Sequence, residues 1–535
     1  MSALPPPTEP RTLIDDLLED QQRLTAVERF ARSHERHELP AQARYYRELI
    51  PLAKPQPGEQ YAFGVDLDKC TGCKACVSAC HLLNGLDEDE IWRNVGSIHG
   101  GSRTEPYQQT VTTACHHCVE PGCLQGCPVM AYEKDPETGI VRHLDDQCIG
   151  CEYCLLKCPY DVPKYSKKRG IVRKCDMCYH RLAANEAPAC VQACPNEAIT
   201  IRIADVAATR AAAQPGARLL PGAFDSSYTL PTTTYTTRKT IPANAHPGDV
   251  YRLRLEHPHW PLIWMLLLSQ LSAGLQCAVP WVIRPQFAAV LAVAAFLVLQ
   301  AGLILSVFHL GKPMKAWRFF LGLRTSWMSR EILVFSLFAG ASGGVAACST
   351  AALWFPQLHP YVRPGAIGAA VLALGGIFCS SMIYIDTHRP FWSARLTFVR
   401  FFGTALSLGV GATAALASWL HMPRAFPLCL AAIVIGILHT AIDLGAFHRS
   451  LENDEAPSHR SARTVKQLLR PVLDLRATAF LAFAGAGLLA PFMQDTPRAI
   501  AATIAFAGLA VAAIAERYCF FTAVDAPRMP GGIAA

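Results

Sequence analysis

The sequence predicts a chain of two dissimilar parts: a small α+β domain, followed by an all-α polytopic membrane bundle of about eight transmembrane helices. Two observations indicate this fold class. Sixteen of the 21 cysteines lie between Cys70 and Cys194, in the polar first half of the chain. Most of residues 260–521 is instead apolar, in stretches near the roughly 20 residues that cross a bilayer as a helix. At 535 residues the chain is also longer than one typical domain.

The clustered cysteines fall into four groups of four. The groups are Cys70, Cys73, Cys76, Cys80; Cys115, Cys118, Cys123, Cys127; Cys148, Cys151, Cys154, Cys158; and Cys175, Cys178, Cys190, Cys194. The third group, CIGCEYCLLKCP, has the two-residue gaps and closing Cys-Pro of bacterial ferredoxins, where three thiolates bind one iron–sulfur cluster and the fourth binds its neighbour. Groups two and four lengthen one gap and keep the Cys-Pro. Sixteen thiolates suffice for four 4Fe–4S clusters, so the first part is predicted to be a four-cluster ferredoxin-like domain of duplicated two-cluster modules.

Zinc and disulfides are the competing interpretations of these cysteines. Zinc ribbons pair two short Cys-x2-Cys segments and have no use for a third in-line cysteine with a Cys-Pro close. Disulfides need an oxidising compartment. The first residues, MSALPPPTEP, show neither the apolar core of a secretory signal nor a twin-arginine. The spacing therefore favours iron–sulfur clusters.

The first half divides into an arm, a domain and a connecting segment. Residues 1–60 are expected to form an arm with an amphipathic helix over 11–33, which docks either on another subunit or on the chain's own ferredoxin domain. That domain spans 61–203, where YAFGVDLDKC and HLDDQC each read as a strand entering a cysteine group and AITIRI reads as a closing strand. Residues 204–256 are Ala-rich and then Pro/Thr-rich, as in a linker or covering loop.

A basic run, PKYSKKRGIVRKC, lies between cysteine groups three and four. It is open to two interpretations. The run forms a solvated face, or its positive charge beside anionic clusters raises their reduction potential or attracts an acidic partner.

Residues 257–535 are predicted to form the membrane bundle. The apolar spans are 261–282, 287–308, 331–353, 365–385, 399–420, 425–447, 477–493 and 499–521. The seventh is the shortest. Small residues dominate several spans, which suits close packing of helices in lipid.

Basic residues outside the apolar cores fall mainly on one side of the predicted bundle. An even number of spans places both ends of the membrane part on one face, and segments on that face carry sixteen Lys and Arg residues. The opposite loops carry Arg284, Arg363, Arg424 and Arg498. Because Lys- and Arg-rich loops stay in the cytoplasm, we expect a multi-pass inner (plasma) membrane protein with its iron–sulfur domain and C-terminus on the cytoplasmic side.

Ionisable side chains near lipid are costly and indicate function. His309 closes the second span and Glu331 opens the third, both on the side of the ferredoxin domain. A hydrophobic carrier of two electrons and two protons could meet the clusters there. His439, Asp443 and Glu516 are further candidates for the same site.

Structural roles compete with this interpretation. Glu331 could cap its helix near Arg330, and Glu516 could pair with Arg517. A bis-histidine haem needs facing mid-membrane histidines, and only His439 approaches that depth, so no haem is expected.

Two long segments resemble subunits of one known family. Residues 61–203 resemble the four-cluster ferredoxin subunit of the dimethyl sulfoxide reductase family, through the cysteine groups and the sequence VRKCDMC. Residues 257–530 resemble that family's eight-helix membrane anchor, through HPHWPL, HLGKPMKAWR, SWMSREI, MIYIDTHRP and AERYCFF. The resemblance implies a fusion of the two subunits, with menaquinol or ubiquinol bound at His309 and Glu331.

The resemblance also implies which cysteines share a cluster, joining group one with four and group two with three. The implied ligand sets are Cys70, Cys73, Cys76 with Cys194; Cys175, Cys178, Cys190 with Cys80; Cys115, Cys118, Cys123 with Cys158; and Cys148, Cys151, Cys154 with Cys127. The first pair of clusters would face a molybdenum subunit, and the second pair would face the quinone.

The expected function is electron transfer and membrane anchoring: the protein passes electrons through four clusters between the quinone pool and a partner molybdopterin oxidoreductase. Quinone or quinol redox is the only chemistry expected of the chain itself. The alternatives are a self-contained quinone oxidoreductase served by a soluble ferredoxin or flavoprotein, and an ion-translocating module. The formal charge of +7 does not indicate nucleic-acid binding, because the basic residues sit beside the cysteine groups and between the apolar spans.

Overall fold

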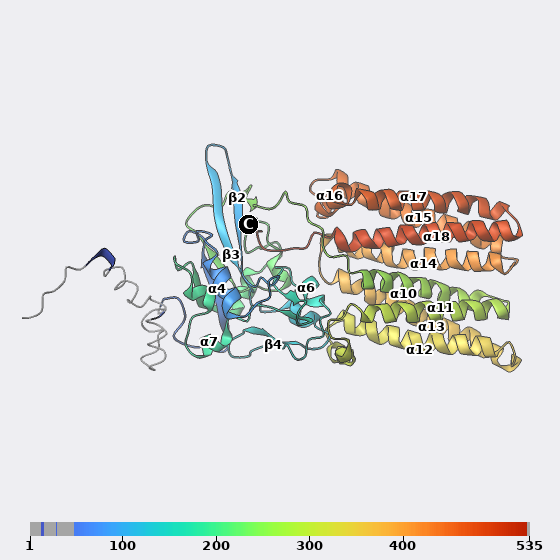
Figure 1. Ribbon diagram of the computed structural model, residues 1–535, viewed down its shortest axis with the longest axis horizontal. Coiled ribbons are helices and arrows are strands. Elements are labelled where there is room, and N and C mark those ends of the chain that lie inside the picture. The colour runs from blue at the N-terminus through green and yellow to red at the C-terminus, as the bar shows by residue number, and fades with distance from the viewer. Residues whose placement is uncertain (1–11, 15–27, 29–47, 532–535) are drawn as a thin grey trace, which may run out of the picture.

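The computed structural model describes residues 12–14, 28 and 48–531. These residues form an elongated molecule with a cysteine-rich domain at one end and a bundle of long helices at the other (Figure 1). The predicted amphipathic helix over 11–33 lies almost entirely outside the described residues.

The cysteine-rich domain contains short strands and short helices joined by long loops. Its strands are β1 (Glu59–Asp66), β2 (Asn94–Gly101), β3 (Pro106–Thr113), β4 (Tyr132–Lys134), β5 (Val141–His143), β6 (Lys164–Ser166), β7 (Ile171–Arg173), β8 (Ile199–Asp205), β9 (Thr234–Thr236) and β10 (His246–Pro247). Its helices are α4 (Ala75–Leu83), α5 (Gly122–Gly126), α6 (Tyr153–Lys157), α7 (Tyr179–Ala183), α8 (Ala189–Gln192) and α9 (Val206–Ala212). The strands predicted before groups one and three and after group four correspond to β1, β5 and β8, which confirms the small α+β class.

Two three-stranded sheets and two hairpins build the domain. Strand β1 pairs with β8 in antiparallel register, so that the two ends of the domain close on each other, and with β9 in parallel register. Strand β2 pairs with β3 and with β10. Strands β9 and β10 belong to residues 204–256, predicted as a linker or covering loop. That segment is therefore an integral part of both sheets rather than a free connection.

The second part holds eight described helices long and apolar enough to cross a membrane. They are α10 (Trp260–Ala278), α11 (Pro285–Val307), α12 (Trp327–Ala351), α13 (His359–Ile385), α14 (Ala394–Trp419), α15 (Ala425–Glu452), α17 (Arg470–Leu489) and α18 (Asp495–Thr522). The eight predicted spans are confirmed, and the seventh is longer than expected because it begins at Arg470 rather than near residue 477. A short helix that was not predicted, α16 (His459–Leu468), precedes it.

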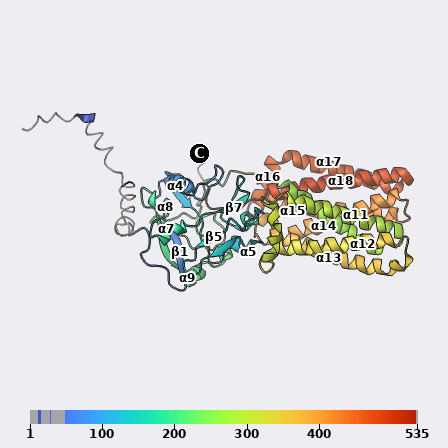
Figure 2. The same cartoon turned by 60° about the horizontal axis from the view of Figure 1, so that its bottom comes forward.

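The long helices run side by side along the long axis of the molecule (Figures 1 and 2). Small residues allow close contact between them, most clearly where α10 crosses α14. A methyl group added to Gly274 would lie 2.1 Å from the Ala405 carbonyl oxygen, and one added to Gly409 would lie 2.4 Å from the Gly274 Cα. Backbones approach this closely in membrane bundles when no side chain intervenes.

Hydrogen bonds tie the cysteine-rich domain to one end of the bundle. Lys157 reaches Asp386 at the end of α13, with 2.7 Å between Nζ and Oδ2. The Tyr153 hydroxyl donates to the Ile383 carbonyl oxygen at 3.2 Å, and the Tyr153 ring packs in the core of the bundle. The third cysteine group, which surrounds α6, therefore lies directly against the membrane helices.

Candidate cluster sites and the adjoining cavity

The fold brings cysteines from distant groups together. Cys76 neighbours Cys190 and Cys194, and Cys80 neighbours Cys178 and Cys190. In the same way, Cys123 neighbours Cys115 and Cys158, and Cys154 neighbours Cys127 and Cys148. Groups one and four thus meet, as do groups two and three. One small cavity is lined by all four members of one implied set: Cys115, Cys118, Cys123 and Cys158.

The spacing of the sulfurs decides between one metal ion and a larger cluster. A tetrahedral zinc ion with bonds of about 2.3 Å holds its sulfurs roughly 3.8 Å apart. Within the described residues, no three cysteine sulfurs lie within 4.8 Å of one another. Burial, reinforced by Cys190, also raises the pKa of the Cys80 thiol to about 12, so a bound positive metal would favour the thiolate form of Cys80. The donor sets fit iron–sulfur cubes better than single ions.

Two buried cations accompany the cysteines. Arg93 is 2 % exposed, and its Nη2 has no hydrogen-bond partner in the described structure. The charged groups nearest to its guanidinium are the thiolates of Cys76, Cys80, Cys175 and Cys190. The Lys174 ammonium is also buried, 3.6 Å from the Cys115 sulfur.

A buried cation without a carboxylate partner is unfavourable. An anionic thiolate-ligated cluster beside each of these two groups would compensate its charge. Sequence analysis missed Arg93, since one arginine in IWRNVG carries no recognisable signal.

The basic run divides between both of its predicted roles. Lys167, Lys168 and Arg169 are exposed, as on a solvated face. Arg173 is buried and paired with the buried Glu90, whereas Lys174 lies among the cysteines. Only the last of these residues can act directly on a cluster.

A cavity lies where the third cysteine group meets the bundle. It encloses about 980 Å³ not filled by atoms, part of it open to solvent. Its walls include Cys151, Glu152, Tyr153, Leu155, Leu156, Asp161, Glu256, His257, His259, Leu262, Met265, His309, Met328, Glu331, Ile383, Tyr384, Arg389, Trp392, Phe521, Val524 and Ala526. Mostly apolar walls with a few converging polar groups are typical of a site for a small organic molecule.

The two residues predicted to form the membrane site, His309 and Glu331, both line this cavity. His309 follows the end of α11 and donates from Nε2 to the Cys151 carbonyl oxygen at 3.3 Å. Burial lowers the pKa of His309 to about 4, so its imidazole is neutral and Nδ1 keeps a lone pair. The ordinary imidazole pKa of about 6.5 therefore does not apply to His309.

Glu331 lies in the first turns of α12 and is 5 % exposed. The suggested capping arrangement with Arg330 is not observed, because Arg330 donates to the carbonyl oxygens of Leu323 and Arg324 and covers the Trp327 ring. Among the described residues, no ion pair involves Glu331. A buried carboxylate in a cavity wall is available to a ligand.

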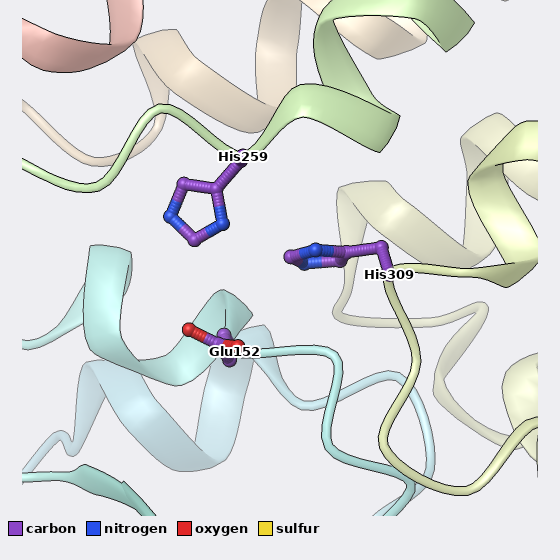
Figure 3. A group of neighbouring side chains, drawn as sticks. All are labelled: Glu152, His259 and His309. Carbon is purple, nitrogen blue, oxygen red and sulfur yellow. The ribbon is translucent and has the colours of Figure 1, made fainter. Parts of the chain in front are cut away.

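Glu152 and His259 are cavity residues that sequence analysis did not select. Figure 3 shows the side chains of Glu152, His259 and His309 near one another, each on a different part of the chain. The His259 and His309 rings meet edge to face, with 5.1 Å between centroids. Burial raises the pKa of Glu152 to about 7 and lowers that of His259 to about 3. His259 lies in the sequence HPH and Glu152 in the sequence CEYC, but only the fold places the two residues together.

His439, Asp443 and Glu516 are not among the residues that line the cavity. Asp443 lies between two arginines of other helices, 2.8 Å from Arg400 and 2.7 Å from Arg476. Glu516 contacts Arg400 at 3.2 Å and Arg517 at 3.6 Å. Asp443, Glu516 and their arginine partners form an ion network that joins α14, α15, α17 and α18, whereas His439 is in no ion pair of the described structure and has Ser407 as its side-chain neighbour, at 3.5 Å. This arrangement agrees with the structural role suggested for the Glu516 and Arg517 pair.

The cysteine quartets and the helical bundle together define a membrane-anchored iron–sulfur electron-transfer protein. Residues 107–203 match a family described as the 4Fe-4S dicluster domain, and residues 255–522 match the DMSO reductase anchor subunit. The protein belongs to the DMSO reductase family, and it joins the iron–sulfur and anchor subunits in one polypeptide.

Curated relatives cover the iron–sulfur part. The protein is similar to one subunit of the anaerobic dimethyl sulfoxide reductase of Haemophilus influenzae, with 34% identity over 172 residues, 30% of this chain and 83% of the relative. It is 38% identical to the corresponding subunit from Escherichia coli K12 over 148 residues, 26% of this chain and 72% of the relative. The hydrogenase-2 operon protein HybA of Escherichia coli O157:H7 is 33% identical over 161 residues, 25% of this chain and 49% of the relative.

Proposed function

We propose that this chain carries electrons between a membrane quinone, menaquinone or ubiquinone, and a separate molybdopterin oxidoreductase. Four 4Fe–4S clusters, when bound, supply the one-electron steps. The sixteen cysteines would hold them in the four sets that pair group one with four and group two with three. The meeting of those groups in the fold supports this assignment.

One observation carries the quinone half of the proposal. A single cavity is lined by His309 and Glu331 of the anchor and by Cys151 of the third cysteine group. A quinol bound there would lie beside a cluster ligand, and the apolar walls from α10, α12 and α13 suit its ring. Electron exit and proton acceptors would then share one chamber.

A quinol releases two protons with its two electrons, so the site must accept them. The neutral His309 imidazole, whose Nε2–H is held by the Cys151 carbonyl, can accept a hydrogen bond from a quinol hydroxyl at Nδ1. Glu331 has no ion pair among the described residues and can take a proton at its carboxylate. The chain thus offers two acceptor groups in the wall of one cavity.

The molybdopterin partner is proposed from the relatives, two of which are named as parts of dimethyl sulfoxide reductases. Clusters of groups one and four would face this partner, at the end of the molecule away from the bundle.

The positive-inside pattern supports a cytoplasmic location for the ferredoxin domain. Three of the sixteen residues counted on that side (Arg400, Arg476 and Arg517) form ion pairs with acidic residues of the bundle, which still leaves thirteen against four.

The test combines purification with kinetics. The protein, purified anaerobically from its native host, should bring with it a large molybdenum-containing subunit, and reduced quinone analogues should reduce its clusters. His309→Ala and Glu331→Gln should each abolish reduction by quinol and leave reduction by dithionite unchanged, because neither residue is a cluster ligand. Wild-type quinol rates in both variants would refute the site. Purification with a ferredoxin or flavoprotein instead would favour a self-contained quinone oxidoreductase.

A further inference from the structure

Three potential metal ligands converge in the cavity wall. Glu152 precedes α6, His259 precedes α10, and His309 follows α11, so the ferredoxin domain and the anchor both contribute. One ligand atom of each residue lies within 4.8 Å of the other two. Figure 3 shows the carboxylate and the two imidazoles near one another on three separate segments of the chain. Among the described residues, this is the sole group of histidine, cysteine and carboxylate side chains with such spacing.

In the described structure, no ion pair involves Glu152, His259 or His309. In the described part of the chain, the Glu152 carboxylate forms no hydrogen bond or ion pair, and the His259 ring makes only aromatic contacts. His309 uses Nε2–H to donate to the Cys151 carbonyl oxygen. Metal-binding histidines typically donate their second ring nitrogen to such a carbonyl, which fixes the tautomer and the orientation of the ring.

We propose that Glu152, His259 and His309 bind a divalent zinc ion, and that the bound ion blocks electron exchange between quinone and clusters. The inhibitory half rests on the proposed function, because the ion would withdraw His309 from the cavity. The binding half rests on the three side chains alone.

The ligand set selects the class of metal. Two imidazoles and one carboxylate match the three protein ligands of open zinc sites, whereas magnesium and calcium prefer sites built of oxygen alone. In a tetrahedral site with zinc bonds of about 2.0–2.2 Å, the ligand atoms lie roughly 3.3–3.6 Å apart. The three ligand atoms, now within 4.8 Å of one another, would reach this spacing by rotation of the three side chains when the ion binds. The carboxylate would also offset half of the charge of the ion in this half-buried position.

Zinc binding is measured on the full-length purified protein by calorimetry with zinc chloride, in parallel with quinol-driven cluster reduction. The wild type should bind one zinc ion per molecule at this site, and zinc should inhibit the quinol reaction in a way that EDTA reverses. Glu152→Gln and His259→Gln should each weaken zinc binding by about 100-fold. This is the upper end of the loss in metal affinity that follows when only a group that supports a ligand is removed. The zinc concentration for inhibition should rise by the same factor.

Glu256→Gln is the matched control, since Glu256 lines the same cavity outside the triad. It should bind zinc with wild-type affinity. Reduction by dithionite in the presence of zinc should be unchanged, which shows that the ion leaves the clusters intact.

The outcomes separate the two proposals. Equal zinc affinity in the wild type, Glu152→Gln and His259→Gln would overturn the metal site. Zinc binding that depends on the triad but leaves the quinol rate unchanged would overturn the inhibition. Failure of quinol to reduce the clusters without any zinc would instead refute the proposed function, and calorimetry would still decide the metal site.

Discussion

The Nε2 nitrogen of His309 lies 3.3 Å from the backbone carbonyl oxygen of Cys151. This hydrogen bond joins a residue just beyond a membrane helix to a residue of the third cysteine group, 158 positions earlier in the sequence. It positions the imidazole in the wall of the cavity and the cysteine beside it. The two halves of this fused protein therefore meet at the point where electrons would pass between them.

Iron content tests the cluster assignment. Four all-cysteine quartets predict about sixteen irons in each anaerobically purified molecule. Cys151→Ser should perturb a cluster of groups two and three and leave the clusters of groups one and four assembled, as measured by iron analysis and electron paramagnetic resonance. About eight irons in the wild type, or bound zinc in the cysteine quartets, would contradict the assignment.

Lys174→Met should lower the reduction potential of the cluster nearest Cys115. A positive charge about 6 Å from a cluster, at an effective dielectric constant of about 20, contributes about 3 kcal/mol to the free energy of reducing that cluster. That energy corresponds to on the order of 100 mV for one electron. Redox titration followed by electron paramagnetic resonance measures the change. Lys167→Met, at an exposed position of the same basic run, is the control and should leave every potential unchanged.

Gly311→Ala should loosen the contact between the two parts of the protein. A Cβ atom at Gly311 would lie 2.1 Å from the carbonyl oxygen of Gly170, which itself has a positive φ of 64°. The quinol-driven rate should fall while reduction by dithionite persists. Gly340→Ala is the matched control, because no atom lies within 4 Å of the added methyl group. Unchanged quinol kinetics in Gly311→Ala would show that this close approach is not needed for docking.

Asp443→Asn should destabilise the bundle without changing the clusters. The substitution leaves Arg400 and Arg476 buried without the carboxylate that now lies between them. Breaking a buried ion pair in this way costs about 3–5 kcal/mol. Thermal unfolding in detergent measures the loss. The exposed pair of Asp474 and Arg470 provides the control, since Asp474→Asn should change stability by less than about 0.5 kcal/mol. A stable Asp443→Asn variant with impaired quinol turnover would instead support a role for Asp443 in quinol oxidation.

Orientation can be tested with reporter fusions. A reporter active only in the periplasm should stay silent when fused after Ala535 and be active when inserted near Arg363. The basic residues concentrate on the membrane face opposite Arg363, which is therefore expected to be the cytoplasmic face. The reverse pattern would mean that the ferredoxin domain is exported.

The sequence by itself determined the cysteine quartets, the eight spans and the candidacy of His309 and Glu331. Each depends on short-range pattern: ligand spacing within one loop, apolar length matched to a bilayer, or charge at the end of a span. Such patterns are legible because they arise from local geometry and from the surrounding solvent.

Tertiary structure alone decided which residues share a site. Arg93 lies among cysteines of two distant groups, and the Asp443 carboxylate pairs with arginines from two other helices. Glu152, His259 and His309 converge from three segments that no spacing connects. Burial and charge compensation depend on what the fold packs around each group, and that is a property of the whole molecule rather than of any stretch of it.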